Sequence, residues 1–127
     1  MRVHDVHERT LAATPEQVES LFEDIDAIWP DPQPVAEGAG LRMGPMLWQR
    51  FKRGDTTLAW RISSPRDLPA VHWFDIHPDG NGGTLLRHTV EGQALGECEA
   101  QWRDEIEPML GAYIEALFNR TQERLLA

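Results

Sequence analysis

The side chain best placed to do chemistry in this sequence is that of His88. It belongs to an alternating run in which Thr84, Leu86 and Val90 share its side of a strand and Arg87 takes the other. A neutral imidazole can donate or accept a hydrogen bond, and near neutral pH it can act as a general base. The alternative is a core histidine whose nitrogens are satisfied by a hydroxyl or a backbone carbonyl of the protein itself.

Two further polar side chains are candidates for the same space. Tyr113 is the only tyrosine, and it stands on the apolar stripe of a predicted C-terminal helix, from which its hydroxyl could reach a bound molecule. Arg50 would bind a carboxylate if its side chain points inward; otherwise it belongs to a solvated strand face. Alternation alone leaves the inward face of 46–52 open, because both sets of side chains mix polar and apolar types.

Other kinds of site find little support. His4 and His7 would lie on opposite faces of a strand, and the other histidines lack the cysteines and closely spaced carboxylates of a metal centre. The glycine-rich 80–83 lacks the lysine and hydroxyl residue of a phosphate loop, and no serine lies in a nucleophile elbow. Cys98 lies near the N-terminus of a predicted helix, which would lower its pKa somewhat, although an inert, half-buried thiol is the preferred interpretation. We predict neither a metal ion nor a cofactor.

Composition is that of an ordinary soluble protein. The 127 residues, 41% hydrophobic and 26% charged, suffice for one domain, 1–127, with a core of its own. A formal net charge of −9 argues against nucleic acid and anionic membranes, both of which attract Lys and Arg. The single cysteine excludes an intrachain disulfide, the N-terminus lacks an apolar signal core, and no apolar run approaches a membrane span. We expect a cytoplasmic location.

The elements that must position these side chains follow from local patterns. The opening 2–10 alternates loosely, as a strand does. Thr14, Pro15 and Gln17 then form a capping box that starts a helix, and Trp29, which precedes a proline, ends the segment.

From Val35 onward the pattern changes to short strands and turns. In the predicted strand 58–63 the apolar side chains on the same face as Trp60 must point inward. In 71–77 we favour the face that carries His72, Phe74 and Ile76 as the inward one. Turns this short require antiparallel neighbours. The predicted strands span 46–52, 58–63, 71–77 and 84–91.

The C-terminal third is predicted to be helical. Its apolar residues recur at 3.6-residue spacing and form one stripe. Pro108 interrupts the pattern, and it either kinks a single long helix or starts a second one. We favour the second alternative, with a lead-in helix over 97–104 and a main helix from about Glu105 to Leu125. The stripe consists of Trp102, Ile106, Met109, Leu110, Tyr113, Ile114, Leu117 and Phe118.

This order of elements, together with three short motifs, resembles the START/Bet v 1-like (SRPBCC) superfamily, which includes polyketide cyclases and aromatases. The motifs look like the family's strand-to-helix entry, the end of its second helix and the strand that leads into its final helix. They are Thr10 to Val18 (TLAATPEQV), Asp24-Ile25-Asp26 with Trp29-Pro30, and Gly83-Thr84 with Leu86, His88 and Gly92.

The resemblance implies an α+β helix-grip fold, in which a curved antiparallel sheet wraps around a long C-terminal helix and a short helix pair follows the first strand. It also implies a cavity between the sheet and that helix. We expect this cavity to be lined by Trp48, Arg50, Trp60, His72, Phe74, Leu86, His88, Trp102, Met109 and Tyr113.

Three functions are compatible with such a cavity, because the superfamily hosts many on one scaffold. The first is binding of a small apolar or aromatic molecule, lipid-like or polyketide-like. The second is a cyclase- or dehydratase-like enzyme without a metal, with His88 as the candidate catalytic residue. The third is an interaction protein with a vestigial cavity that works by forming a homodimer or by docking a partner.

Overall fold

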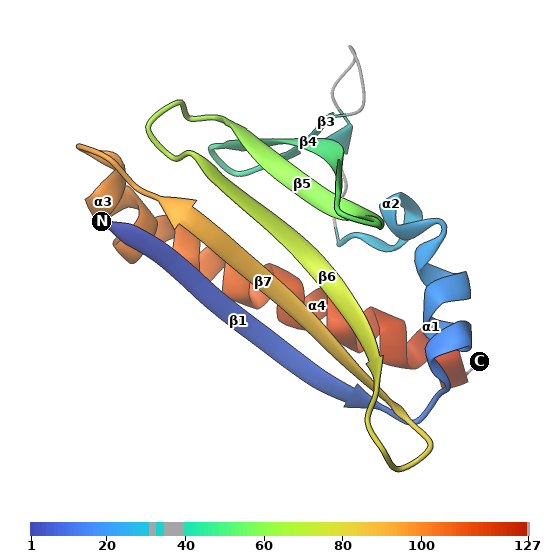
Figure 1. The fold of residues 1–127 in the computed structure, drawn as a ribbon. Coiled ribbons are helices and arrows are strands. Elements are labelled where there is room, and N and C mark those ends of the chain that lie inside the picture. The colour runs from blue at the N-terminus through green and yellow to red at the C-terminus, as the bar shows by residue number, and fades with distance from the viewer. Residues whose placement is uncertain (31–32, 35–39, 127) are drawn as a thin grey trace.

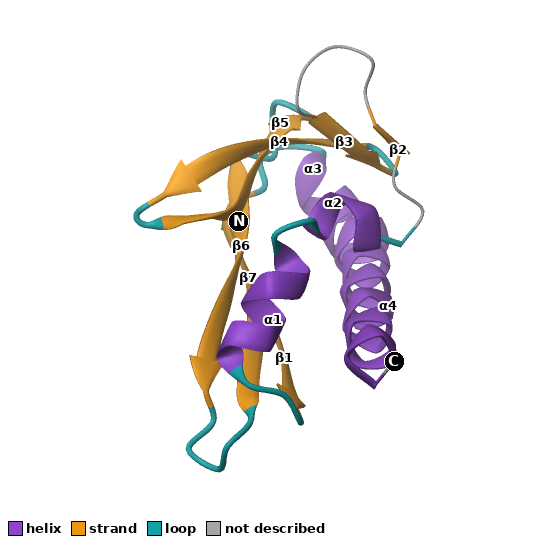
Figure 2. Cartoon of the chain, turned by 90° about the vertical axis from the view of Figure 1, so that its right-hand side faces the viewer, coloured by secondary structure: helices purple, strands orange, loops and turns teal. Residues whose placement is uncertain are grey.

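The chain forms a curved antiparallel sheet that bends over a long C-terminal helix (Figures 1 and 2). The computed structural model describes residues 1–30, 33–34 and 40–126. Its seven strands lie in the order β1-β7-β6-β5-β4-β3-β2, which confirms the expected helix-grip architecture. The strands are β1 (Arg2–Leu11), β2 (Gln33–Pro34), β3 (Gly40–Met43), β4 (Met46–Arg53), β5 (Thr56–Ser64), β6 (Ala70–Pro78) and β7 (Thr84–Gln93).

All strands predicted from the sequence are present, each slightly longer than expected. Strands β2 and β3 were not predicted, because two or four residues give too short a pattern to recognise. The predicted start of the strand region at Val35 lies outside the described residues.

Two short helices follow β1, as expected: α1 (Pro15–Phe22) and α2 (Ile25–Ile28). The capping box is formed as predicted. The hydroxyl of Thr14 accepts a hydrogen bond from the Gln17 N–H at 3.2 Å, and the Gln17 side chain accepts one from the Thr14 N–H at 2.8 Å. Val18 and Phe22 are the buried residues of α1, so this helix packs its apolar face against the sheet.

Helical residues run without a break from Cys98 to Leu126, so the predicted helix break before Pro108 is wrong. The run consists of α3 (Cys98–Gln101), the π-helical turn η1 (Trp102–Ile106) and α4 (Glu107–Leu126). Proline lacks an N–H and its ring needs space in the preceding turn. The wide π turn ends at Ile106, two residues before Pro108, and provides that space. Within the described part of the chain, no helix combines the length and apolarity needed to cross a membrane.

Polar contacts in the C-terminal half of α4 fix this helix against β1 and the end of α2. Arg9 on β1 reaches three side chains of α4: its guanidinium lies 2.5 Å from Glu115 Oε2, 2.8 Å from Asn119 Oδ1 and 2.5 Å from Gln122 Oε1. On the far side of the helix, Arg120 donates to the backbone carbonyl of Trp29 at 2.9 Å. The helix therefore holds the edge strand β1 and the end of α2 in fixed positions on either side.

The backbone of Pro69 and Ala70 passes so close to Gly92 that a side chain at this position should destabilise the fold. A Cβ at this residue would lie 2.5 Å from the Ala70 Cα and closer still to the Pro69 carbonyl oxygen, both of which are backbone atoms that cannot rotate away. We expect Gly92→Ala to lower the free energy of unfolding by about 1–3 kcal/mol, the usual cost of forcing extra atoms into a packed site. Urea denaturation measures it. Gly54→Ala, at a positive φ but with open space around it, is the control and should cost only about 1 kcal/mol.

Candidate functional site

Aromatic rings from α2, the sheet and α4 meet on the concave side of the sheet. Trp29, the residue that ends α2, is fully buried at their centre. Its ring centroid lies 5.5 Å from that of Trp48 and 5.2 Å from that of Trp60, both edge-on. Phe74 lies at 5.7 Å, and Tyr113 is stacked on Trp29 at 5.6 Å. With His72, these residues form what we call the aromatic cluster: Trp29, Trp48, Trp60, His72, Phe74 and Tyr113.

Burial settles which face of each strand points to the cluster. On β5 the inward residue Trp60 is 1% exposed whereas Arg61 is exposed, as predicted. On β6 the favoured set is inward, with His72 at 0%. On β4, where the sequence left the choice open, Trp48 is fully buried and Arg50 on the same face is half-buried.

Two histidines form a buried hydrogen-bonded pair at the edge of the cluster. His72 Nδ1 lies 3.0 Å from His88 Nε2, and neither residue is exposed to solvent. In the sheet register Phe74 is opposite His88, so the two histidines are diagonal neighbours on β6 and β7. Aromatic rings enclose the pair. Trp60 stacks on His72 at 5.4 Å, Trp48 meets it edge-on at 4.1 Å, and Phe74 lies 4.9 Å from His88.

Both imidazoles are neutral near neutral pH. Burial lowers the pKa of His72 to about 3, because an imidazolium loses its hydration there. The pKa of His88 is also held well below its usual value, first by burial and then by the nearby His72 and His7 rings. A group with so low a pKa is a weak base at neutral pH, so the pair is better suited to hydrogen bonding than to taking up a proton.

The hydrogen bond between two neutral rings couples their tautomers. If His72 Nδ1–H donates, His88 carries its proton on Nδ1, and His72 Nε2 is left as an acceptor. If His88 Nε2–H donates instead, the roles of the two outer nitrogens are exchanged. The pair therefore always offers one donor and one acceptor at its outer nitrogens, His72 Nε2 and His88 Nδ1.

Four buried ring nitrogens on this side of the sheet have no hydrogen-bond partner among the described residues. They are Trp29 Nε1, Trp48 Nε1, His72 Nε2 and His88 Nδ1. Leaving a buried polar group unpaired costs ~1–3 kcal/mol, so native proteins rarely gather several in one place. The site therefore combines apolar aromatic walls with unused hydrogen-bonding groups.

The other predicted lining residues lie around the cluster. Arg50 places its guanidinium 5.5 Å over the Trp60 ring, and its Nε donates to the Thr57 carbonyl at 2.8 Å. Leu86 and Trp102 are part of the buried core, and Met109 packs against that core from α4. None of these three residues makes one of the ring contacts that define the cluster in the described structure.

The expectation of a lowered pKa for Cys98 is wrong. Burial, followed by the carboxylates of Asp67 and Glu97, raises the pKa of this thiol. The residue is buried at the start of α3, which has only four residues and a correspondingly weak dipole.

Sequence reasoning missed two residues near the site. Trp29 was taken only as the end of a helical segment, although it is the centre of the cluster. His7 lies on the inward face of β1, where its ring centroid is 6.2 Å from that of His88 and its Nε2 is 2.9 Å from Asp5 Oδ2. Alternation with the buried Val3 and Leu11 could have placed His7 inward.

A hollow of about 270 Å³ lies beside the cluster, between α1 and the β4–β5 hairpin. Phe22 on its wall meets Phe74 edge-on at 5.4 Å, and Arg50 on the opposite wall covers Trp60. The hollow is lined by Glu19, Phe22, Glu23, Arg50, Thr57 and Leu58.

The sheet, the helix pair and the gripped terminal helix define the fold of Bet v 1-like proteins. Solved structures of this fold match nearly the whole chain. Ara h 8.0201 is 15% identical with a TM-score of 0.70, and 99% of each chain is covered. TTHA0849 from Thermus thermophilus is 21% identical with a TM-score of 0.60, over 98% of this chain and 97% of the other.

A Thalictrum norcoclaurine synthase point mutant in complex with a transition state analogue is 10% identical with a TM-score of 0.67, over 98% of this chain and 96% of the other. No family model and no curated protein matches the sequence. At these identities the likeness establishes the fold, and function must be argued from the site.

Proposed function

We propose that the chain binds a small, planar aromatic molecule that carries a hydrogen-bonding group, and that the aromatic cluster and the His72–His88 pair hold it. The observation that supports this most directly is the set of four buried ring nitrogens without a described partner. A hydroxyl or carbonyl on the ligand would satisfy one of them, whereas the flat rings of the cluster match a flat apolar body.

The neutral histidine pair favours binding over acid–base catalysis. An acid–base catalyst works best when its pKa lies near the working pH, and the pKa of His72 is about 3. As a hydrogen-bonding anchor, however, the pair has a useful property. Because its two tautomers exchange the donor and acceptor ends, it can accept from a phenol or donate to a ketone without moving either ring.

Access to the cluster is proposed through the hollow beside α1. Two of its lining side chains contact the cluster from outside, Phe22 against Phe74 and Arg50 over Trp60, so they separate the hollow from the cluster rings. The norcoclaurine synthase complex is a case of a protein with this fold that holds a small molecule.

The test compares 2-naphthol with naphthalene, which has the same rings but no hydroxyl. We expect the wild-type protein to bind 2-naphthol about tenfold more tightly, because only the hydroxyl pairs with a buried nitrogen. In His88→Ala that preference should fall to about twofold or less. Quenching of tryptophan fluorescence, supported by calorimetry, gives both dissociation constants.

His77→Ala is the matched control, because His77 is exposed on β6 and lies outside the cluster. It should keep the tenfold preference. The ratio of the two constants, unlike either one alone, is insensitive to a modest loss of folded protein. If His88→Ala retained the wild-type ratio, or if neither compound bound to the wild type, the proposal would be wrong.

A further inference from the structure

The pairing between β5 and β6 is short for two strands of nine residues each. Their described pairing consists of Ala59↔Trp73, Trp60↔His72 and Arg61↔Val71, whereas β6 pairs with β7 along its whole length. Beyond Arg61, β5 and β6 separate and leave a hollow of about 400 Å³. This volume is within the usual range for small-molecule sites, ~300–1,000 Å³.

The sequence explains why the two strands separate there. In the same register Ser63 would lie opposite Pro69, which has no N–H to donate to a neighbouring strand. The chain before β6 instead bonds to the segment after β7: the Pro69 carbonyl accepts from Gln93 N–H at 3.0 Å, and the Asp67 carbonyl accepts from Leu95 N–H at 2.8 Å. These bonds draw residues 67–69 towards β7 and away from β5.

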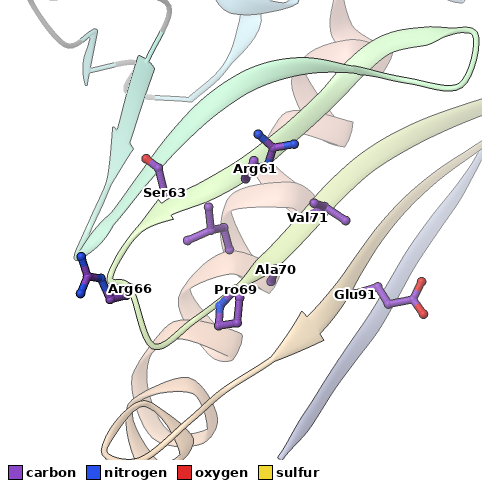
Figure 3. A pocket seen from close by; sticks show the side chains of 8 residues that line it. Arg61, Ser63, Arg66, Pro69, Ala70, Val71 and Glu91 are labelled. Carbon is purple, nitrogen blue, oxygen red and sulfur yellow. The ribbon is translucent and has the colours of Figure 1, made fainter.

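The hollow has an apolar floor and a charged rim (Figure 3). Ile62 and Ala70, which point inward and are 5% and 4% exposed, form the floor together with Pro69. Arg61 and Arg66 are the exposed cations of the rim.

The positive charge of the two rim arginines favours binding of an anion. Among the described residues, no carboxylate forms an ion pair with Arg61 or Arg66; the Arg61 guanidinium lies 4.7 Å over the Phe51 ring. The one carboxylate on the rim, Glu91, has its own partner, because its Oε1 lies 3.7 Å from the Arg2 guanidinium. The hollow is thus a locally basic surface on a chain with a net charge of −9.

We propose that this hollow is a second binding site, for a small molecule that combines a carboxylate with an apolar body. The guanidinium groups would hold the carboxylate, for which their planar fork of N–H donors is well matched. The apolar body would cover Ile62, Ala70 and Pro69. The site is separate from the aromatic cluster, because none of the residues that line the hollow belongs to the cluster, and it does not rest on the function proposed above.

The experiment measures binding of 2-naphthoate and of its neutral methyl ester by calorimetry. The wild type should bind the acid about tenfold more tightly than the ester, and the difference should shrink at high salt, because exposed charges are screened. The double variant Arg61→Ala/Arg66→Ala should bind acid and ester alike. Glu91→Gln removes the opposing carboxylate and should tighten binding of the acid a few-fold. This gain cannot result from misfolding.

Arg103→Ala, which removes an exposed arginine outside the hollow, is the matched control and should bind like the wild type. The proposal fails if the double arginine variant binds the acid as the wild type does. Should the acid be lost in His88→Ala and kept in the double variant, the acid occupies the aromatic cluster. That result overturns the second site and leaves the first proposal standing.

Discussion

Lowering the pH from 8 to 5 should cost the fold about 2 kcal/mol through His72, and His88 should add to the loss. In the folded chain burial holds the pKa of His72 at about 3, so this ring stays neutral over the whole range, and burial also holds the pKa of His88 well below its usual value. In the unfolded chain each ring titrates near its ordinary pKa of about 6.5. Below that pH the unfolded state therefore binds more protons, and His72 alone lowers the stability by about 2 kcal/mol at pH 5.

The loss should begin as the pH falls through about 6.5 and continue until the folded pKa of His72 is reached, near 3. Urea denaturation at several pH values between 8 and 5 measures it. The double variant His72→Gln/His88→Gln keeps hydrogen-bonding side chains but cannot titrate, so most of the loss should disappear. His77→Gln, at an exposed position on β6, should leave the wild-type dependence unchanged. An equal slope in wild type and double variant would contradict the buried, neutral pair.

The contrast between fold and site shows what local patterns can predict. The capping box at Thr14, the turns and the alternation of β5, β6 and β7 each depend on a few neighbouring residues, and all of them formed as predicted. The continuity of the helix through Pro108 was missed, because it depends on a π turn that hydrophobic spacing does not encode.

The site needed information that no single segment contains. Alternation placed His72 and His88 on inward faces, but their contact depends on the register that sets Phe74 opposite His88. Trp29 is a sharper case. The chain that follows α2 had to bring this ring under the sheet, and no spacing rule along the sequence predicts such a long-range position.

Replacing Trp29 by alanine should lower the free energy of unfolding by about 3–5 kcal/mol, the usual cost of deleting a large buried aromatic side chain. The ring is fully buried and contacts Trp48, Trp60, Phe74 and Tyr113, so its loss removes the centre of the cluster rather than one edge. The surrounding rings come from different elements and can collapse only partly into the space. Urea denaturation at pH 8, where both buried histidines are neutral in either state, isolates this packing loss.

Rescue by free indole separates a true cavity from general unfolding. An apolar cavity left by a deleted ring can bind a molecule of the same shape, and such binding stabilises the folded state by mass action. Added indole should therefore raise the urea midpoint of Trp29→Ala and leave that of the wild type almost unchanged. Trp73→Ala is the matched control, because Trp73 lies on the outer face of the sheet beneath the Arg53 guanidinium, 3.8 Å away. Trp73 is 7% exposed but lies outside the core cluster, and the exposed Arg53 side chain covers it, so its removal leaves a space bordered by a surface side chain and indole should rescue that variant much less. If indole rescued both variants equally, or neither, Trp29 would not be the enclosed centre of the site.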